Sequence, residues 1–337
     1  MAKKNVLITG ATGFIGGHIL DENLVRGNRV RAFVLPGDPA IESLKKRKVE
    51  VFEGDITDYR AVREAVRGMK IVFHCAAVVT DWAPRSLFER VTLGGAENIC
   101  RACSEEKVDR LVDISTNDVF GMDEKNVMDE SFPLRPWGEP YPDFKIKSEQ
   151  IMWRYHREKG LRVSMVYPCW VYGRNDRTFV PLLADAIIKG DLIFWRKYVL
   201  VWPAYVLNVV DLVMLIAQDD RAIGRGYLVH DGESDTFQNF CALIAGAVGC
   251  EPIKTHIPYF AAYAAAFVME GLWKILGKKT RPLLTTYTVK NLGSRFRFSI
   301  DRAKRELGWA PKYSYREAFA ETLEWLKTVD IESYAQK

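Results

Sequence analysis

A tyrosine and a lysine four residues apart could carry proton-transfer chemistry. Tyr141 and Lys145 lie at the start of a segment, 143–159, whose pattern predicts a helix, so the two side chains share one helical face. A positive charge about 4 Å from a phenol is worth roughly 4 kcal/mol at a surface-like dielectric, or about three pKa units. We therefore expect Lys145 to lower the pKa of Tyr141, which could then exchange a proton with a carbonyl or alcohol oxygen.

A second pair with the same spacing competes with this assignment. Tyr155 and Lys159 lie near the end of the same predicted helix, just before Gly160. Their surroundings are typical of a solvated helix face. We favour Tyr141.

Hydroxyl groups at the end of a predicted strand could assist such a tyrosine. Ser115 and Thr116 follow the apolar run that ends at Ile114. Open α/β sheets place their ligands at the carboxyl ends of the strands, so a hydroxyl here could bind the reacting oxygen. The alternative is that both residues only cap a turn.

The first twenty residues predict the element that would position a cofactor. The apolar run 5–8 leads into Gly10, Gly13 and Gly16, and an amphipathic stretch then runs to Gly27, which indicates a strand, a tight turn and a helix. Gly10 lets the chain reverse, Gly13 lets backbone approach a pyrophosphate, and Gly16 lets the helix lie close to the strand. The helix N-terminus adds free N–H groups and a partial positive charge. We interpret the turn as a dinucleotide site rather than an ordinary glycine-rich turn.

Strand-like and helical segments alternate over residues 1–168. The predicted strands include 30–35, 49–52, 70–75, 110–114 and 161–167, and the predicted helices include 58–66 and 87–103. This rhythm predicts an α/β fold with a Rossmann-type doubly wound parallel sheet. Residues 1–168 would form the dinucleotide-binding domain.

Residues 169–337 have a looser pattern, rich in aromatic residues. Helical spacing recurs at 181–189, 209–218, 237–248 and 259–276. No linker-like stretch separates this part from the first. We therefore expect a smaller, mostly helical C-terminal substrate lobe that is interleaved with the sheet and is not an independent domain.

Composition points to a globular protein. The chain has 337 residues, 48% of them hydrophobic and 27% charged, with a net charge of +5. The dense basic cluster 45–48 is expected to end a helix, the alternative being a nucleic-acid patch. We expect no nucleic-acid partner.

The cysteines and the N-terminus indicate a cytoplasmic protein. The six cysteines lie mostly in apolar segments, and Cys100 and Cys103 have no second Cys/His pair nearby, so buried thiols are expected and no metal site. Residues 1–4 run directly into the first strand without a secretory signal. A reducing compartment suits free thiols.

One apolar run, 257–269, is too short to cross a bilayer, which takes about 20 residues. We interpret it as a core or lid helix. The alternative is a surface that touches a membrane or an apolar substrate. No transmembrane segment is expected.

Taken together, motifs along the whole chain resemble the extended short-chain dehydrogenase/reductase family. That family includes nucleotide-sugar epimerases, dihydroflavonol reductases and 3β-hydroxysteroid dehydrogenases. The matching segments are 9–16, 54–58, 74–77, 115–116 with 119–121, Tyr141 with Lys145, Pro168 with 171–173, Asp211 and 307–311.

The resemblance implies roles for individual residues. Tyr141 would be the general acid/base, Thr116 the catalytic hydroxyl, and Lys145 the group that lowers the tyrosine pKa and holds the nicotinamide ribose. Homodimers built through helices that correspond to 87–103 and 143–159 would also be expected. The residues implied to bind the cofactor, NAD(P), are Gly10, Thr12, Gly13, Phe14, Ile15, Gly16, Asp55, Ile56, Ala76, Ala77, Lys145 and Pro168.

Three departures from the family pattern bear on the substrate. Phe144 stands where a small residue is usual and would narrow that wall. Asn117 and Asp118 replace the acid pair of sugar-nucleotide dehydratases, which argues against a dehydratase. Ala204, seven residues before Asp211, stands where sugar-nucleotide enzymes carry an arginine for the diphosphate.

Aromatic residues surround Ala204 in the sequence. They are Trp195, Tyr198, Trp202 and Tyr205. An apolar, steroid-, flavonoid- or lipid-like substrate is therefore expected. The alternative is that these aromatics only form lid core.

The end of the second strand bears on cofactor preference. An acid there binds the ribose 2′-hydroxyl of NAD, and an arginine accommodates the 2′-phosphate of NADP. Val34 and Leu35 occupy the position, Asp38 comes late and Arg31 lies inside the strand. The missing acid favours NADP.

The sequence thus predicts an NAD(P)-dependent oxidoreductase that transfers a hydride between nicotinamide and a secondary alcohol or ketone. A nucleotide-sugar epimerase would use the same tyrosine and lysine, but Ala204 argues against it. A non-catalytic cofactor-binding protein would be expected to lack Tyr141 or Lys145, and both are present.

Overall fold

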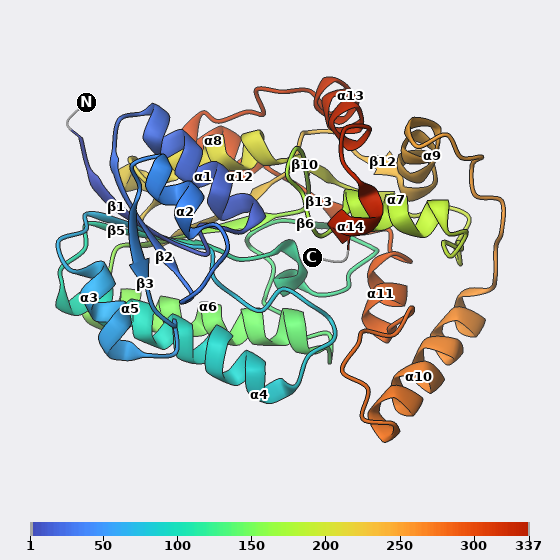
Figure 1. The fold of residues 1–337 in the computed structure, drawn as a ribbon, viewed down its shortest axis with the longest axis horizontal. Helices are drawn as coiled ribbons and strands as arrows, with labels where there is room; N and C mark the ends of the chain where they lie inside the picture. The colour runs from blue at the N-terminus through green and yellow to red at the C-terminus, as the bar shows by residue number, and fades with distance from the viewer. Residues whose placement is uncertain (1–2, 336–337) are drawn as a thin grey trace.

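A single parallel sheet of seven strands forms the centre of the computed structural model, which describes residues 3–335 (Figure 1). The strand order is β11-β7-β5-β4-β1-β2-β3, and every neighbouring pair is parallel. The strands are β1 (Asn5–Thr9), β2 (Arg29–Val34), β3 (Glu50–Glu53), β4 (Ile71–His74), β5 (Arg110–Ile114), β7 (Val163–Pro168) and β11 (Arg225–Val229). The chain order reverses between β1 and β4, as in a doubly wound Rossmann fold.

The strands form where the sequence has short apolar runs. All residues of β4, β5 and β7 are buried, as expected for strands covered by helices on both faces. The predicted strands are confirmed, with ends that differ by one or two residues. The sequence did not predict β11, which adds a seventh strand beside β7.

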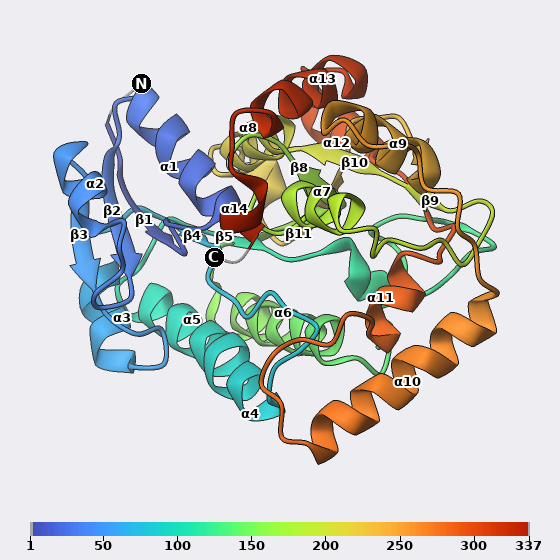
Figure 2. The same cartoon turned by 45° about the vertical axis from the view of Figure 1, so that its right-hand side comes forward.

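Helices cover both faces of the sheet, as both views show (Figures 1 and 2). One face carries α1 (Phe14–Val25) and α8 (Val206–Ile216). The other carries α3 (Tyr59–Val66), α5 (Gly95–Glu105) and α6 (Pro140–Lys159). The predicted helix 87–103 consists of α4 (Arg85–Leu87), a π-helical stretch η1 (Phe88–Gly94) and most of α5.

A second core holds the C-terminal lobe together. Large aromatic side chains such as Tyr172, Phe237, Phe240 and Phe319 are fully buried in it. Around them lie α7 (Val180–Ile188), α9 (Phe237–Ala247), α13 (Tyr315–Leu326) and α14 (Ile331–Ala335). Short strand pairs complete the lobe: β8 (Trp170–Tyr172) with β10 (Pro203–Tyr205), and β9 (Leu200–Val201) with β12 (Asp235–Thr236).

The two parts of the chain are interleaved. Both β11 and α8 follow residue 168 in sequence, yet β11 joins the main sheet and α8 packs on α1. Segments from both sides of residue 168 therefore contribute to the same sheet and to the same helix layer.

Two helices stand at the edge of the molecule. They are α10 (Tyr259–Ile275) and α11 (Thr286–Asn291), and α10 packs mainly on α11 (Figure 2). Within residues 3–335, no helix is long and apolar enough to cross a membrane.

The remaining elements are short. They are α2 (Ile41–Lys46), α12 (Asp301–Leu307), the 3-10 turns η2 (Asn117–Phe120) and η3 (Asp220–Ala222), and the paired strands β6 (Val127–Met128) and β13 (Arg297–Phe298).

Two smaller predictions are confirmed by the structure. The basic cluster ends α2, where Arg47 forms an ion pair with Asp21. Cys100 and Cys103 are buried free thiols on α5.

Candidate active site

The glycine turn lies where the strand order reverses, between the ends of β1 and β4. Gly10 has a φ of +65°, and a Cβ there would come within 3.0 Å of the backbone of Cys75 and Ala76. A Cβ on Gly16 would lie 2.1 Å from the Gly10 carbonyl oxygen. The turn can therefore close only with glycine at these two positions.

The turn leaves the start of α1 open to an anion. Gly13 is the N-cap residue, and no side chain caps the helix. The Gly13 N–H donates to the Gly10 carbonyl over 3.0 Å, while Phe14 and Ile15 begin the helix. Uncapped first-turn N–H groups bind phosphate readily. This arrangement fits the pyrophosphate of NAD(P).

The predicted adenine side lies at the ends of β2 and β3. The Thr12 hydroxyl donates to the Asp38 carboxylate over 2.9 Å, which brings Asp38 to the glycine turn. Asp55 is exposed after β3, and its carboxylate accepts the Thr57 N–H over 2.8 Å. Ile56 is buried beside it.

The ends of β4 and β7 complete this edge of the sheet. The N–H groups of Cys75 and Ala76 both donate to the Thr9 hydroxyl over 3.2 Å, which fixes the chain after β4. Ala77 follows, half-buried, and Pro168 ends β7. The structure therefore gathers the predicted cofactor residues along one edge of the sheet.

The three predicted catalytic residues come together between β5 and α6. Tyr141 lies in the first turn of α6, half-buried. Thr116 caps η2 by accepting the Asp118 N–H over 3.3 Å, and its hydroxyl lies close enough to the Tyr141 phenol to influence the pKa of that group. The Lys145 ammonium is buried and donates to the Ile114 carbonyl over 2.7 Å. Ser115, in contrast, contacts the buried Glu149 behind the site.

Groups other than Lys145 set the pKa of Tyr141 in this structure, so the prediction that the lysine lowers it stays a prediction. Burial raises the pKa of Tyr141, the negative charges of Asp118 and Asp113 add to this rise, and only the Thr116 hydroxyl opposes it. The physical reason is placement, because the lysine ammonium lies against the end of β5. There it favours the charged form of buried Asp113, whose pKa burial raises.

Sequence reasoning missed a tyrosine from the far end of the chain. Tyr287 on α11 donates to the Asp118 carboxylate over 2.7 Å, and its ring meets that of Tyr141 edge-on at 6.2 Å. Burial raises the pKa of Asp118 to about 6, against the effect of the Tyr287 hydrogen bond. The signal for Asp118 was its position beside Thr116, whereas no local pattern marks Tyr287.

Charged contacts hold α11 against the start of α6 and hold the residues just before α11 against Asp81. The Lys290 ammonium donates to the Glu139 carboxylate over 2.6 Å at the start of α6. Arg281 donates twice to Asp81, each time over 2.6 Å, and Thr285 also donates to this carboxylate. We call Asp81 with Arg281 and Thr285 the Asp81 clasp. Burial acts to raise the pKa of Asp81, but these donors lower it overall.

The comparison with known families decides what kind of protein this is. The sequence profile of the NAD dependent epimerase/dehydratase family matches residues 6–229, from β1 to the end of β11. The chain belongs to this family. The predictions of an extended short-chain dehydrogenase/reductase and of an NAD(P)-dependent enzyme are confirmed at this level.

Relatives of this family member cover nearly its whole length. A ketoreductase of a farnesylated dihydroquinoline oxide from Stigmatella aurantiaca is 29% identical over 92% of the chain and 93% of its own length. A 3β-hydroxysteroid dehydrogenase/Δ5→4-isomerase from Mycobacterium tuberculosis is 29% identical over 94% and 89%. The crystal structure of gox2253 superposes with a TM-score of 0.80 at 26% identity, over 97% of this chain and 98% of the other.

The aromatic residues around Ala204 mostly form core in this enzyme. Trp195 donates to the Val289 carbonyl, and Trp202 donates to the Phe296 carbonyl. Tyr205 is buried. The expectation that these side chains surround a substrate is therefore corrected for Trp195, Trp202 and Tyr205, because their polar atoms are used inside the fold, whereas Tyr198 is 46% exposed.

Phe144 also has a packing role. It is buried and stacks on Phe88 at 5.4 Å between ring centres, which places it in the contact between α6 and η1. The competing Tyr155 donates to Glu97 over 2.8 Å near the other end of α6, away from Thr116. Rejection of Tyr155 agrees with this geometry.

Proposed function

We propose that this enzyme transfers a hydride between a nicotinamide and a secondary alcohol or ketone of a mostly apolar, steroid-, flavonoid- or lipid-like molecule. The observation that carries the proposal is the approach of Tyr141 to Thr116 at the carboxyl end of β5, on the sheet edge that holds the glycine turn.

Each catalytic residue has a task that follows from its contacts. The bound cofactor supplies or accepts the hydride. Tyr141 gives a proton to the substrate oxygen or takes one from it, and the Thr116 hydroxyl beside the phenol orients it. Lys145, held on the Ile114 carbonyl, fixes a positive charge beneath the cofactor edge.

Two contacts support NAD as the preferred cofactor, in place of the NADP that the strand end alone favoured. Arg31 is engaged with Glu50 and with the Ala65 carbonyl, so it is not free for a 2′-phosphate. The Asp38 carboxylate lies on the glycine turn through Thr12. A carboxylate there accepts hydrogen bonds from a ribose and repels a 2′-phosphate.

The lack of a positively charged side chain at position 204 supports an apolar substrate. Ala204 is fully buried in the main core, on a strand beside Val171, so nothing at this position binds a diphosphate. Two relatives act, by their names, on a farnesylated quinoline derivative and on a steroid.

The test is nicotinamide absorbance with NADH and NADPH against two panels, apolar ketones and nucleotide sugars. We expect oxidation of NADH with an apolar ketone. A changed sugar without net oxidation would instead establish the alternative, a nucleotide-sugar epimerase, which uses the same tyrosine and lysine.

Two features of the working state are also part of the proposal. A homodimer would form through α5 and α6, which lie side by side on one face of the sheet (Figure 2). A cytoplasmic location suits the six free cysteines. Analytical ultracentrifugation tests the dimer.

A further inference from the structure

The outward face of α10 is apolar along its whole length. Phe260 is 75% exposed, Phe267 68% and Ile275 82%, whereas only Ala262 and Ala266 of this 17-residue helix are buried. A helix on the surface of a globular protein normally turns a polar face to solvent. In α10 the face turned to solvent is apolar instead.

Charges are nearly absent from the exposed face. Glu270 is mostly covered and accepts hydrogen bonds from Thr286 on α11. Lys274 is the exposed charge on the helix. Val268 and Leu272 lie between the large apolar groups and are also exposed.

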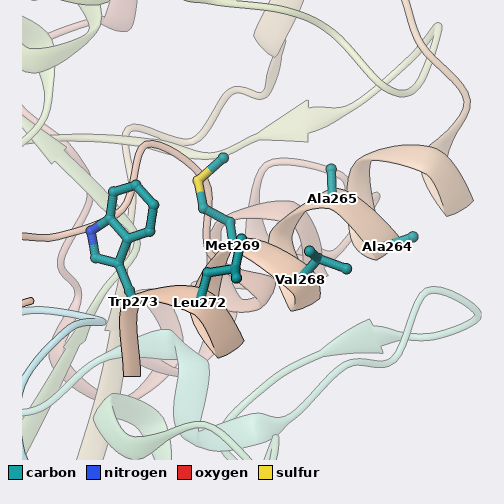
Figure 3. A pocket seen from close by; sticks show the side chains of 6 residues that line it. All are labelled: Ala264, Ala265, Val268, Met269, Leu272 and Trp273. Atoms are coloured by element: carbon teal, nitrogen blue, oxygen red, sulfur yellow. The ribbon is translucent and has the colours of Figure 1, made fainter. Parts of the chain in front are cut away.

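The same helix bears a shallow apolar hollow of about 480 Å³ (Figure 3). Residues spaced along successive turns of α10 line it, and none of them is charged. They are Ala264, Ala265, Val268, Met269, Leu272 and Trp273.

Cations gather at the C-terminal end of this face. Lys274, Lys278, Lys279 and Arg281 lie within eight residues, and Lys278 sits 4.4 Å from the centre of the Trp273 ring. Arg281 is neutralised by Asp81 in the clasp. Three lysines, of which Lys274 also forms an ion pair with Glu270 over 3.8 Å, therefore stand beside an uncovered apolar surface.

We propose that α10 docks, lying flat, on a lipid bilayer that carries anionic headgroups. Phe260, Phe267, Val268, Leu272 and Ile275 would enter the boundary between headgroups and acyl chains, and the lysines would face the lipid charges.

Charge complementarity favours a bilayer over a second copy of the chain as the occupant. Pairing through another protein face would need acids opposite the three lysines, and α10 itself carries only Glu270, which α11 covers. Anionic lipids supply that complement for every lysine at once.

Docking would also orient the site. Since α10 packs on α11, and Tyr287 of α11 contacts Asp118 beside the catalytic tyrosine, this side of the enzyme would face the membrane. The inference goes beyond the proposed reaction, and its test does not require turnover.

The experiment is co-sedimentation of the full chain with vesicles. One preparation is phosphatidylcholine alone, and the other contains about one third phosphatidylglycerol. We expect strong binding to the second, weaker binding to the first, and a loss on adding salt. The tryptophan fluorescence of the chain should shift to the blue on binding.

Matched variants locate the contact. Ile275→Glu should weaken binding about tenfold or more, while Val25→Glu on α1, at the same 82% exposure, should leave it unchanged. Lys278→Gln and Lys279→Gln should each weaken binding to anionic vesicles about fivefold. Thermal unfolding of each variant checks that it folds.

Three results would overturn the proposal. They are no binding to either vesicle, binding that Ile275→Glu leaves intact, and a dimer in solution that Ile275→Glu dissociates, since a second copy would then cover this face.

Discussion

Where we place the pyrophosphate of the cofactor, the exposed groups are backbone atoms of one turn, whereas where we place the substrate they are side chains from distant segments. The glycine turn and the start of α1 lie within residues 10–16. The wall opposite is built by Asp118 from the middle of the chain and Tyr287 from its end, 169 residues apart. The cofactor side thus depends on local geometry, and the substrate side depends on the whole fold.

This difference suggests how each side can be changed by mutation. A substitution on the cofactor side should act through the shape of the backbone, and the binding of NAD should report it. On the substrate side, a substitution should act through a single functional group, and turnover or its pH dependence should change while NAD binding does not.

The largest expected effect separates the two sides most clearly. Tyr141→Phe removes the proton donor, so kcat should fall about 100- to 10,000-fold. NAD affinity, measured by fluorescence titration, should stay within twofold. Wild-type turnover in this variant would contradict the assignment of Tyr141.

A pair of glycine substitutions tests the cofactor side. Gly16→Ala would place a Cβ 2.1 Å from the Gly10 carbonyl oxygen, so the turn must shift. We expect NAD binding to weaken about tenfold or more and the free energy of unfolding to fall by about 1–3 kcal/mol.

Gly17→Ala is the matched control one position along. Its Cβ would lie 3.6 Å from the nearest atom, the Ala11 oxygen, which is an ordinary contact. This variant should bind NAD normally and gain about 0.5–1 kcal/mol, because alanine is the better helix former. Equal loss of binding in both variants would show that the turn is not tight.

A smaller effect is expected from Tyr287→Phe. Burial already raises the pKa of Asp118 to about 6, and the Tyr287 hydroxyl lowers it. Without that donor the pKa of Asp118 should rise further. The midpoint of the rate's pH dependence that reflects loss of the Asp118 proton should therefore move upward. Rates against pH check this, with Tyr263→Phe on α10 as a control that lacks the contact.

The free energy of unfolding gives an independent test of the ionisation of Asp118. The pKa of Asp118 is about 6 when folded and 3.8 for the unperturbed side chain, so protonation favours the folded state. Ionisation between about pH 4 and pH 6 then costs up to about 3 kcal/mol of stability. Asp118→Asn should remove that slope, as measured by urea unfolding across this range, and should abolish the kinetic midpoint. An unchanged slope would show that Asp118 is ionised without penalty.

The smallest effect should come from Tyr155→Phe. This tyrosine has the same spacing to a lysine as the catalytic pair, but its hydroxyl donates to Glu97 near the end of α6. We expect kcat to stay unchanged and stability to fall by about 0.5–1.5 kcal/mol. A loss of turnover to match that of the Tyr141 variant would overturn the choice between the two pairs.

The sequence predicts the sheet and the glycine turn well because both are coded locally. Apolar runs mark the buried strands, and Gly16 is dictated by its contact with Gly10, six residues before it. Gly10 is in addition dictated by Cys75 and Ala76, which follow β4, the neighbouring strand in the sheet. The strand β11 was missed because more than 50 residues of lobe separate it from β7, its partner in the sheet.

The structure brings the predicted catalytic residues together, but the sequence did not predict their electrostatics. The spacing of Tyr141 and Lys145 places them on one helix face, yet it does not say that the ammonium lies on the Ile114 carbonyl. Nor can a local pattern show that Tyr287 arrives beside Asp118, because that contact exists only once α11 packs on the catalytic helix. The sequence also could not show that aromatic residues near Ala204 pack inside the fold, because that packing depends on contacts between distant segments.

The Asp81 clasp also indicates the order in which parts of the chain fold. Its Arg281 lies 200 residues from Asp81, so closing that loop costs roughly 5 kcal/mol of chain entropy, against roughly 3 for the turn from β1 to β2. The nucleotide half should therefore acquire its shape first and α11 should settle last. Pulse-labelled hydrogen exchange during refolding should show protection of β1 and β4 before α11. A nascent chain would then be able to hold its cofactor before it has a place for its substrate.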